Sequence, residues 1–357
     1  NPSNQNFHSL LIDGLSQTTP VDVISARPYS HKQQKIGYYP PMHQANFHYL
    51  GLMNAPILKP ISIVKQAVKW IENIRKKDSI ILVDSLNLTL FEVVKHCKNK
   101  WQIPVFALVT DLAENMSSVP NRYKQKMQKT YALYDGFLCL TEGINSKVNL
   151  LNKPFHIFHG LVKESRAQSN DKSYSPYFFF AGAIYRRYGI IALLEAFSLI
   201  QGDYQLLIAG QGPDVPYVLE ACENDARIHY LGVLPRSEVL AYEAASLANI
   251  NPRLFDVSLD QYSIPSKLLE YLASGRPTIT THHTLLLEEF GDYVIHAKEG
   301  DTVDLAEAMV ALLKNEEHYN QLAKKAKEIL FAHYDYQVVS QKIIDYLTSV
   351  TKMDSSF

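Results

Sequence analysis

Residues 247–279 read LANINPRLFDVSLDQYSIPSKLLEYLASGRPTI, and this stretch determines how the second half of the chain folds. Its first five residues, 247–251, are predicted to form a buried strand. Pro265 stands at the expected first position of a helix whose apolar residues recur with helical spacing. Gly275 marks the expected end of that helix, and residues 278–280 predict the next strand. The stretch is therefore a strand, loop, helix and strand unit.

The start of this predicted helix is suited to bind phosphate. A proline at the first position leaves the N–H groups of Ser266, Lys267 and Leu268 unpaired at the positive end of the helix dipole. Lys267 adds a full charge, and Glu270 is placed to accept hydrogen bonds from a sugar hydroxyl such as a ribose. These groups suit a nucleotide diphosphate. An ordinary crossover helix is built in the same way, so both interpretations stay open.

The same stretch resembles the donor-binding element of retaining GT-B glycosyltransferases of family 4. A bacterial polysaccharide sub-group of that family has the pattern NPR, a loop, and then S-[FI]-PSK-x-x-EY-x-x-SG-x-P. Residues 251–253 and 263–277 match this pattern almost throughout. Glu270 matches the second of two glutamates that many members carry, and Tyr262 stands in the place of the first. The resemblance implies an α/β fold of two Rossmann-like domains with parallel sheets that face a cleft.

The length of the chain agrees with two such domains, because 357 residues exceed one ordinary core. Residues 163–175 are rich in Ser, Asn and Lys without apolar periodicity, which predicts the boundary. We expect an N-terminal acceptor-side domain over 1–165 and a nucleotide-sugar-binding domain over 166–335. The resemblance further implies that a first strand precedes the numbering and that a last helix, 336–357, packs back on the first domain.

Composition favours a soluble, cytoplasmic protein. Apolar residues make up 46% and charged residues 20%, no apolar run reaches 18 residues, and no signal-peptide pattern appears. The three cysteines Cys97, Cys139 and Cys222 are scattered, which is typical of reduced thiols. No Arg/Gly or aromatic-interleaved pattern favours nucleic acid. The sequence leaves open whether the protein forms homo- or hetero-oligomers.

Charge is distributed unevenly although the net charge is −1. Residues 1–172 contain 21 Lys and Arg against 12 Asp and Glu, whereas the remainder contains 14 against 24. Lysine-rich patches at 75–77 and 122–129 suit an anionic lipid surface or a lipid-phosphate acceptor, and equally suit solvated helix faces. Peripheral association with the inner face of a membrane through the basic N-terminal domain is one interpretation of this asymmetry.

Short apolar runs and helical patterns alternate in the N-terminal half, which predicts a parallel sheet with its ligand site beyond the carboxyl ends of the strands. The expected strands are 80–83, 105–109, 132–141 and 155–158. Relatives commonly have His-Asp after the second of these, where this chain has Thr110 and Asp111. Asp111 is therefore a candidate catalytic residue that fixes an acceptor or sugar hydroxyl. An N-cap or turn role explains it equally well.

The second domain is expected to hold the departing diphosphate. In the family the loop after its first strand contains an Arg and a Lys, but Ala183 and Tyr188 occupy those places here. Other cations must then neutralise the leaving group in a partly desolvated cleft. Arg253 and Lys267 are candidates for a catalytic role. Arg186 and Arg187 are two further candidates to bind the diphosphate. In the alternative interpretation both side chains face solvent.

The other expected donor contacts come from backbone-rich segments. A glycine turn follows the predicted strand 205–209, and the resemblance places the loop after strand 227–231 beside the nucleobase. The expected contacts are Gly182, Gly210, Gly212, Val233, Leu234, Ser263, Ile264, Pro265 and Ser266.

The resemblance implies a retaining hexosyltransferase whose donor is a nucleoside-diphosphate sugar, and a UDP-sugar is the donor that we expect. The expected acceptor is a glycan, a glycolipid or a glycoprotein. Same-face attack needs no paired catalytic carboxylates. No metal-ligand spacing appears either, so we expect no cofactor and no metal, with a helix dipole and cations in their place. A catalytically silent partner subunit or glycan-binding protein is the alternative, and a sugar-nucleotide epimerase is a third hypothesis.

Overall fold

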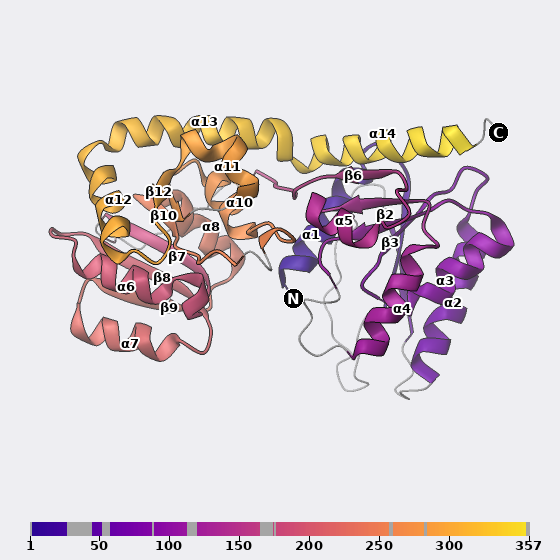
Figure 1. Cartoon of the computed structure of the whole chain (residues 1–357), viewed down its shortest axis with the longest axis horizontal. Coiled ribbons are helices and arrows are strands. Elements are labelled where there is room, and N and C mark those ends of the chain that lie inside the picture. Colours follow the sequence, from indigo (N-terminus) through magenta and orange to yellow (C-terminus); the bar gives the residue numbers. More distant parts are fainter. Residues whose placement is uncertain are drawn as a thin grey trace. The chain divides into compact units, whose positions relative to one another are not determined.

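The computed structural model shows two compact units, each built on a parallel sheet (Figure 1). Unit 1 consists of residues 1–161, 261–263 and 336–357, and unit 2 of residues 162–260 and 264–335. The described residues are 2–26, 45–51, 58–87, 89–112, 120–164, 174, 176–256, 260–281 and 284–354.

Unit 1 contains a four-stranded parallel sheet in the order β3-β4-β5-β6 and a separate parallel pair, β1-β2. Side chains of β4 alternate between two cores: Val105 and Ala107 face α2 to α5, and Phe106 and Leu108 face α1 and α14. Figure 1 shows α2, α3 and α4 on the side of the sheet opposite α14. The elements are α1 (Pro2–Leu15), β1 (Val21–Ala26), β2 (Ala45–Leu50), α2 (Leu58–Ile74), β3 (Ile81–Asp84), α3 (Leu90–His96), a π-helical turn (Cys97–Trp101), β4 (Val105–Val109), α4 (Asn121–Tyr131), β5 (Gly136–Cys139), α5 (Glu142–Val148), β6 (Phe155–Ile157) and α14 (Tyr336–Asp354).

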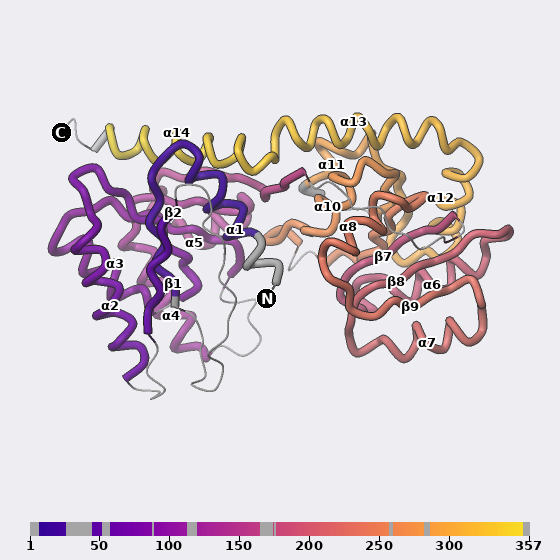
Figure 2. The backbone as a smooth tube through the Cα atoms, turned by 180° about the vertical axis from the view of Figure 1, so that it is seen from behind, coloured from indigo at the N-terminus to yellow at the C-terminus, as the bar shows by residue number. Residues whose placement is uncertain are grey.

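Unit 2 contains a six-stranded parallel sheet in the order β12-β11-β10-β7-β8-β9. Helices α6, α7 and α12 share one core with the sheet, and α8 packs on its other face. Figure 2 shows the tube of this unit from behind, with α7 outermost beside β9. The elements are β7 (Tyr177–Ala183), a 3₁₀ turn (Arg186–Tyr188), α6 (Ile190–Ser198), β8 (Gln205–Gln211), α7 (Val215–Asn224), β9 (Ile228–Gly232), α8 (Arg236–Ala245), β10 (Ala248–Asn251), α10 (Ser266–Ser274), β11 (Thr278–Thr281), α11 (Thr284–Phe290), a 3₁₀ turn (Gly291–Tyr293), β12 (Ile295–Ala297), α12 (Thr302–Lys314) and α13 (Glu316–Tyr334).

The predicted fold class is confirmed: both sheets are parallel, and the last helix, α14, packs on α1 within unit 1. The strand expected over 132–141 is wrong in its extent, because β5 spans only residues 136–139. Asp135 precedes this strand, and its carboxylate accepts a hydrogen bond from the N–H of Val105 at 2.8 Å and forms an ion pair with Lys98. Periodicity did not predict β2 or the π-helical turn.

Gly210 is required by a close approach between neighbouring strands. It stands opposite Gly182 in the β7–β8 ladder with φ at 141°, and a Cβ on it would lie 1.8 Å from the carbonyl oxygen of Gly182. Side chains rarely adopt that backbone conformation. The carboxyl ends of β7 and β8 can therefore meet only without a side chain here.

We predict that Gly210→Ala lowers the melting temperature of the protein far more than Gly232→Ala does. Gly232 also has a positive φ, 69°, but a Cβ on it would meet no atom within 4 Å. The control therefore carries only the backbone cost of about 1 kcal/mol, whereas Gly210→Ala adds a clash with backbone and should cost several kcal/mol. Equal shifts in calorimetric melts of the two variants would contradict this explanation.

Candidate functional site

The order of the six-stranded sheet reverses between β7 and β10, which lie side by side at its centre. In open α/β sheets such a switch point is where ligands bind, beyond the carboxyl ends of the strands. The loops that follow the two strands are joined there. A Cβ on Gly189, whose φ is 77°, would lie 1.8 Å from the carbonyl oxygen of Pro252, and the N–H of Leu254 donates to the carbonyl of Arg187 at 3.1 Å.

Two arginines converge on one aromatic ring at this point. The guanidinium carbons of Arg187 and Arg253 lie 4.9 and 5.4 Å from the ring centroid of Tyr188. Arg253 also forms an ion pair with the buried Asp260, whose second oxygen accepts the N–H of Asp256 at 2.7 Å. Cation–π contacts and a buried carboxylate thus hold two positive charges at the switch point.

Arg186 contacts other groups than Arg187 does. Its side chain is 61% exposed, its Nε lies 3.5 Å from Asp214, and its guanidinium covers the ring of Tyr217 at 4.5 Å. Both Arg186 and Arg187 are exposed, as the interpretation of solvent-facing arginines predicts, and Arg187 differs by its contact with the Tyr188 ring.

The glycine turn predicted after β8 is bonded to the loop after β7. The N–H of Ile184 donates to the carbonyl of Gln211 at 2.9 Å, and the N–H of Asp214 donates to the carbonyl of Ile184 at 3.3 Å. Gly182, Gly210 and Gly212 therefore lie in one backbone assembly, since they end or follow two paired strands. Any ligand contact there would come from the backbone.

Helix α10 begins one residue later than predicted. Pro265 is its N-cap with extended backbone, Ser266 is the first helical residue, and Gly275 ends the helix in the left-handed conformation as expected. The prediction that Leu268 has a free N–H is wrong, because this group donates to the carbonyl of Pro265 at 3.0 Å. Among the described residues, nothing accepts the N–H groups of Ser266 and Lys267.

The first turn of α10 holds a network of four charged side chains. The ammonium of Lys267 lies 2.5 Å from Glu270 and 3.3 Å from Glu243, a residue of α8. Arg236, at the start of α8, donates to the other oxygen of Glu270 at 3.1 Å. Glu243 is fully buried, and its Oε2 has no hydrogen-bond partner among the described residues. Lys267 and Glu270 are thus brought together as predicted, but the sequence analysis missed Glu243 and Arg236, which no motif marks.

Burial and the network shift the three pKa values in different directions. Burial raises the pKa of Glu243 to about 7, against the opposing effect of Lys267. Burial acts to raise the pKa of Glu270 too, but Lys267 and then Arg236 outweigh it and the pKa is lowered. Burial acts to lower the pKa of Lys267, which the two carboxylates nevertheless raise. Lys267 and Glu270 are therefore charged near neutrality, and Glu243 titrates there.

The other predicted donor contacts are scattered through different surroundings. Val233 is 66% exposed, while Leu234 packs with the cluster that contains Tyr242. Ile264 packs against the core formed by α10, α11 and α13. Ser263 belongs to unit 1, and its hydroxyl is buried without a partner among the described residues.

Asp111 lies in unit 1, directly after β4. Its carboxylate accepts the N–H of Leu112 at 2.7 Å, which is the local turn role that the sequence left open. Thr110 precedes it at the same strand end.

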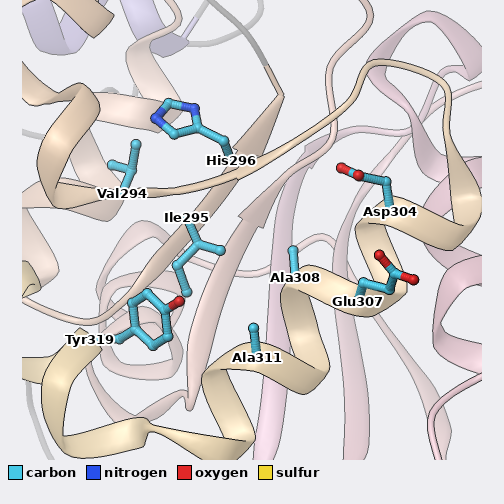
Figure 3. Close-up of a pocket in the computed structure, with 8 residues that line it drawn as sticks. All are labelled: Val294, Ile295, His296, Asp304, Glu307, Ala308, Ala311 and Tyr319. Carbon is cyan, nitrogen blue, oxygen red and sulfur yellow. The ribbon is translucent and has the colours of Figure 1, made fainter.

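A pocket of about 350 Å³ lies elsewhere in unit 2, beside the edge strand β12 (Figure 3). Asp304 and Glu307 line it from α12, and His296 points away from both of them. Asp304 is engaged by Lys298, whose ammonium lies at 3.1 Å. Within the described residues no group of three His, Cys, Asp or Glu could hold a metal ion. The charged groups at the switch point therefore remain the candidate site.

The fold and the switch-point site define the class of this protein, an α/β protein of the GT-B fold. Residues 162–329, which make up most of unit 2, match the family model described as glycosyl transferases group 1. The matched segment is slightly less than half of the chain, and through it the second unit is similar to the group 1 glycosyltransferases. The resemblance predicted from the NPR and PSK motifs is confirmed.

Solved structures are similar in fold over most of the chain. Sucrose-phosphate synthase from Thermosynechococcus elongatus has a TM-score of 0.70 at 13% identity, covering 98% of this chain and 94% of that one. HepE of Anabaena in complex with UDP has a TM-score of 0.64 at 12% identity, covering 86% of this chain and 87% of that one. At these identities the likeness is one of fold.

A curated relative matches a smaller part of the chain. N-acetyl-alpha-D-glucosaminyl L-malate synthase of Bacillus anthracis is 28% identical over 158 residues, which cover 42% of this chain and 39% of the relative. The matched segment therefore spans about two fifths of that relative's length.

The raised pKa of Glu243 predicts how stability depends on pH. The folded state keeps the proton of Glu243 up to about pH 7, whereas the unfolded chain loses it near 4.5, so unfolding releases a proton between these values. The free energy of unfolding should then fall as pH rises from 4.5 to 7, by about 3 kcal/mol from this group.

Glu243→Gln should lose this part of the pH dependence, and Glu238→Gln, an exposed change on the same helix, should keep it. Urea unfolding at a series of pH values measures the difference. Parallel curves for wild type and Glu243→Gln would contradict the prediction.

Proposed function

We propose that the protein is a glycosyltransferase that moves a hexosyl group from a UDP-sugar to an acceptor hydroxyl with retention of configuration. The observation that carries this proposal is the first turn of α10 in a group 1 domain, where Lys267 and Glu270 stand beside two N–H groups that nothing described accepts. The N–H groups and the ammonium bind the diphosphate, and the carboxylate of Glu270 accepts hydrogen bonds from the ribose.

The second element of the proposal is the arginine pair on the Tyr188 ring. Arg187 and Arg253 lie at the carboxyl ends of the two central strands, where a diphosphate bound at a switch point is expected. In the reaction the bond between the anomeric carbon and the diphosphate oxygen breaks, and the bond from that carbon to the acceptor oxygen forms on the same face. The acceptor proton passes to the departing phosphate. The two guanidinium groups and Lys267 stabilise the negative charge that develops on it, so the step needs no metal.

Uridine is the proposed base of the donor. HepE, similar in fold, was solved in complex with UDP and with UDP-glucose. The relative from Bacillus anthracis is named a synthase of N-acetyl-alpha-D-glucosaminyl L-malate, and the glucosaminyl group in that name supports a hexosyl donor. Asp111, Gly182, Val233 and Leu234 remain proposed contacts of acceptor or donor.

Lys267→Ala and Glu270→Ala should each weaken UDP binding by about 1–3 kcal/mol, because each removes a charge-assisted contact. Lys324→Ala, which removes an exposed lysine of α13, is the matched control and should leave the affinity unchanged. Calorimetric titration with UDP, GDP and dTDP measures the effect and the base preference. Unchanged affinity in both site variants would refute the donor site, and UDP binding without donor hydrolysis or transfer would favour a catalytically silent subunit.

We also propose that unit 1 binds to an anionic membrane surface and that the acceptor is linked to a lipid. Helices α2, α3 and α4 form one layer, with α2 packed on α3 and Lys126 of α4 above the ring of Phe91 of α3 at 5.3 Å. Together these helices contain eight Lys and Arg against two Glu. The α2 side of the layer also exposes Leu58, Ile61 and Trp70, which are 47%, 50% and 38% exposed.

Exposed apolar side chains among basic ones are typical of helices that lie in a membrane interface. In the part of the chain that the structure describes, no helix is both long and apolar enough to cross a bilayer. The binding we propose is therefore peripheral and electrostatic in its larger part.

The combined change Arg122→Gln, Lys126→Gln and Lys129→Gln should weaken binding to vesicles that contain phosphatidylserine by about 100-fold, since each basic residue near such a surface contributes about 1 kcal/mol. The pair Lys324→Gln and Lys325→Gln on α13 is the control and should bind like wild type. Sedimentation with vesicles at two salt concentrations measures the affinity. Equal binding to neutral vesicles, or no loss in the triple variant, would refute the surface.

A further inference from the structure

Glu243 has a position that the proposed function does not yet use. Its side chain is fully buried, one oxygen lies 3.3 Å from the Lys267 ammonium, and the other has no partner among the described residues. Its backbone carbonyl accepts hydrogen bonds from Ser246 at 3.0 Å and from Asn249 at 3.2 Å. The end of α8 is thereby fixed to β10, and the carboxylate is held at the first turn of α10.

We propose that Glu243 is a positioning residue of the donor site: it holds Lys267 while the site is free of donor, and it takes up one proton when a nucleoside diphosphate binds. The inference rests on the proposed function, because it assumes that the diphosphate binds at the first turn of α10. The proton comes from water or buffer and is added to a carboxylate oxygen, and no other bond changes.

The charges around Glu243 provide the physical reason. The groups that face it are Arg236 on its own helix and Lys267, Glu270 and Tyr271 on α10. With both glutamates ionised, the two cations are balanced before any ligand arrives. A diphosphate adds at least two negative charges beside Lys267, which must then serve the ligand and two carboxylates in a site of low dielectric.

Protonation of Glu243 removes one of these negative charges, and it needs less free energy than protonation of Glu270. Burial has already raised its pKa to about 7, whereas Glu270 keeps Arg236 as a second partner at 3.1 Å. Lys267 is 32% exposed, so a ligand can reach its ammonium. At higher pH the ionised Glu243 competes with the diphosphate for Lys267, and the affinity for the diphosphate falls.

The test compares the affinity for UDP from pH 6 to pH 8.5 in wild type, Glu243→Gln and Glu238→Gln. The titration of UDP itself is common to the three proteins and cancels in the ratio of their dissociation constants. The ratio of wild type to Glu243→Gln should rise by about 5- to 10-fold between pH 6.5 and pH 8, because one linked proton changes an affinity by at most tenfold per pH unit. The ratio of wild type to Glu238→Gln should stay constant.

Calorimetry of the wild type at pH 7.5 in two buffers with different ionisation enthalpies is the second measurement. It should report proton uptake on UDP binding, and the uptake should be smaller in Glu243→Gln. UDP binding with the same pH dependence and the same proton uptake in both proteins would overturn the role of Glu243 and leave the donor site standing. Absence of binding of any nucleotide to the wild type would overturn the proposed function and this inference with it.

Discussion

The parallel pairing of β7 with β10 is the constraint on which the arrangement of unit 2 depends. Phe178 and Phe179 are in register with Ala248 and Asn249, and the remaining strands are added outward on either side of this pair. Because both strands run in the same direction, the segments that follow them leave the sheet at the same edge. Residues about 65 positions apart in the sequence, such as Arg187 and Arg253, can therefore share the Tyr188 ring.

Two of the positive charges at this edge are paired with carboxylates of the protein. Lys267 is paired with Glu243 and Glu270, and Arg253 with Asp260. A partly buried cation without a partner would be costly, so the carboxylates stabilise these cations in the folded protein. They also reduce the net gain from any anion that binds, because each new contact replaces an existing one. At the proposed donor site the free energy of binding is thus a difference between two sets of ion pairs.

The sequence predicted the elements of unit 2 well where local signals are strong. Gly275 ends α10 as expected, and the apolar run at residues 177–181 lies within β7, which is buried on both faces. It could not predict Glu243 as part of the site, because a single acidic residue on an amphipathic helix carries no local sign that it points inward. The error at Leu268 has a similar origin, since the proline carbonyl that accepts its N–H is placed by the turn before the helix. Contacts between distant segments, rather than local propensity, decide these features.

Tyr188 shows that the charge of a site cannot be judged from one loop of the sequence alone. Within its own loop, the tyrosine stands where the resemblance to family 4 implies a basic residue. In the folded unit the ring lies against one guanidinium from the same loop and another from the loop after β10, and the second is fixed by the buried Asp260. Cation–π contact lets a neutral ring hold two like charges near one another, which a lysine in that place would repel. A change at one strand end can therefore be compensated from the other, because the switch point makes them neighbours.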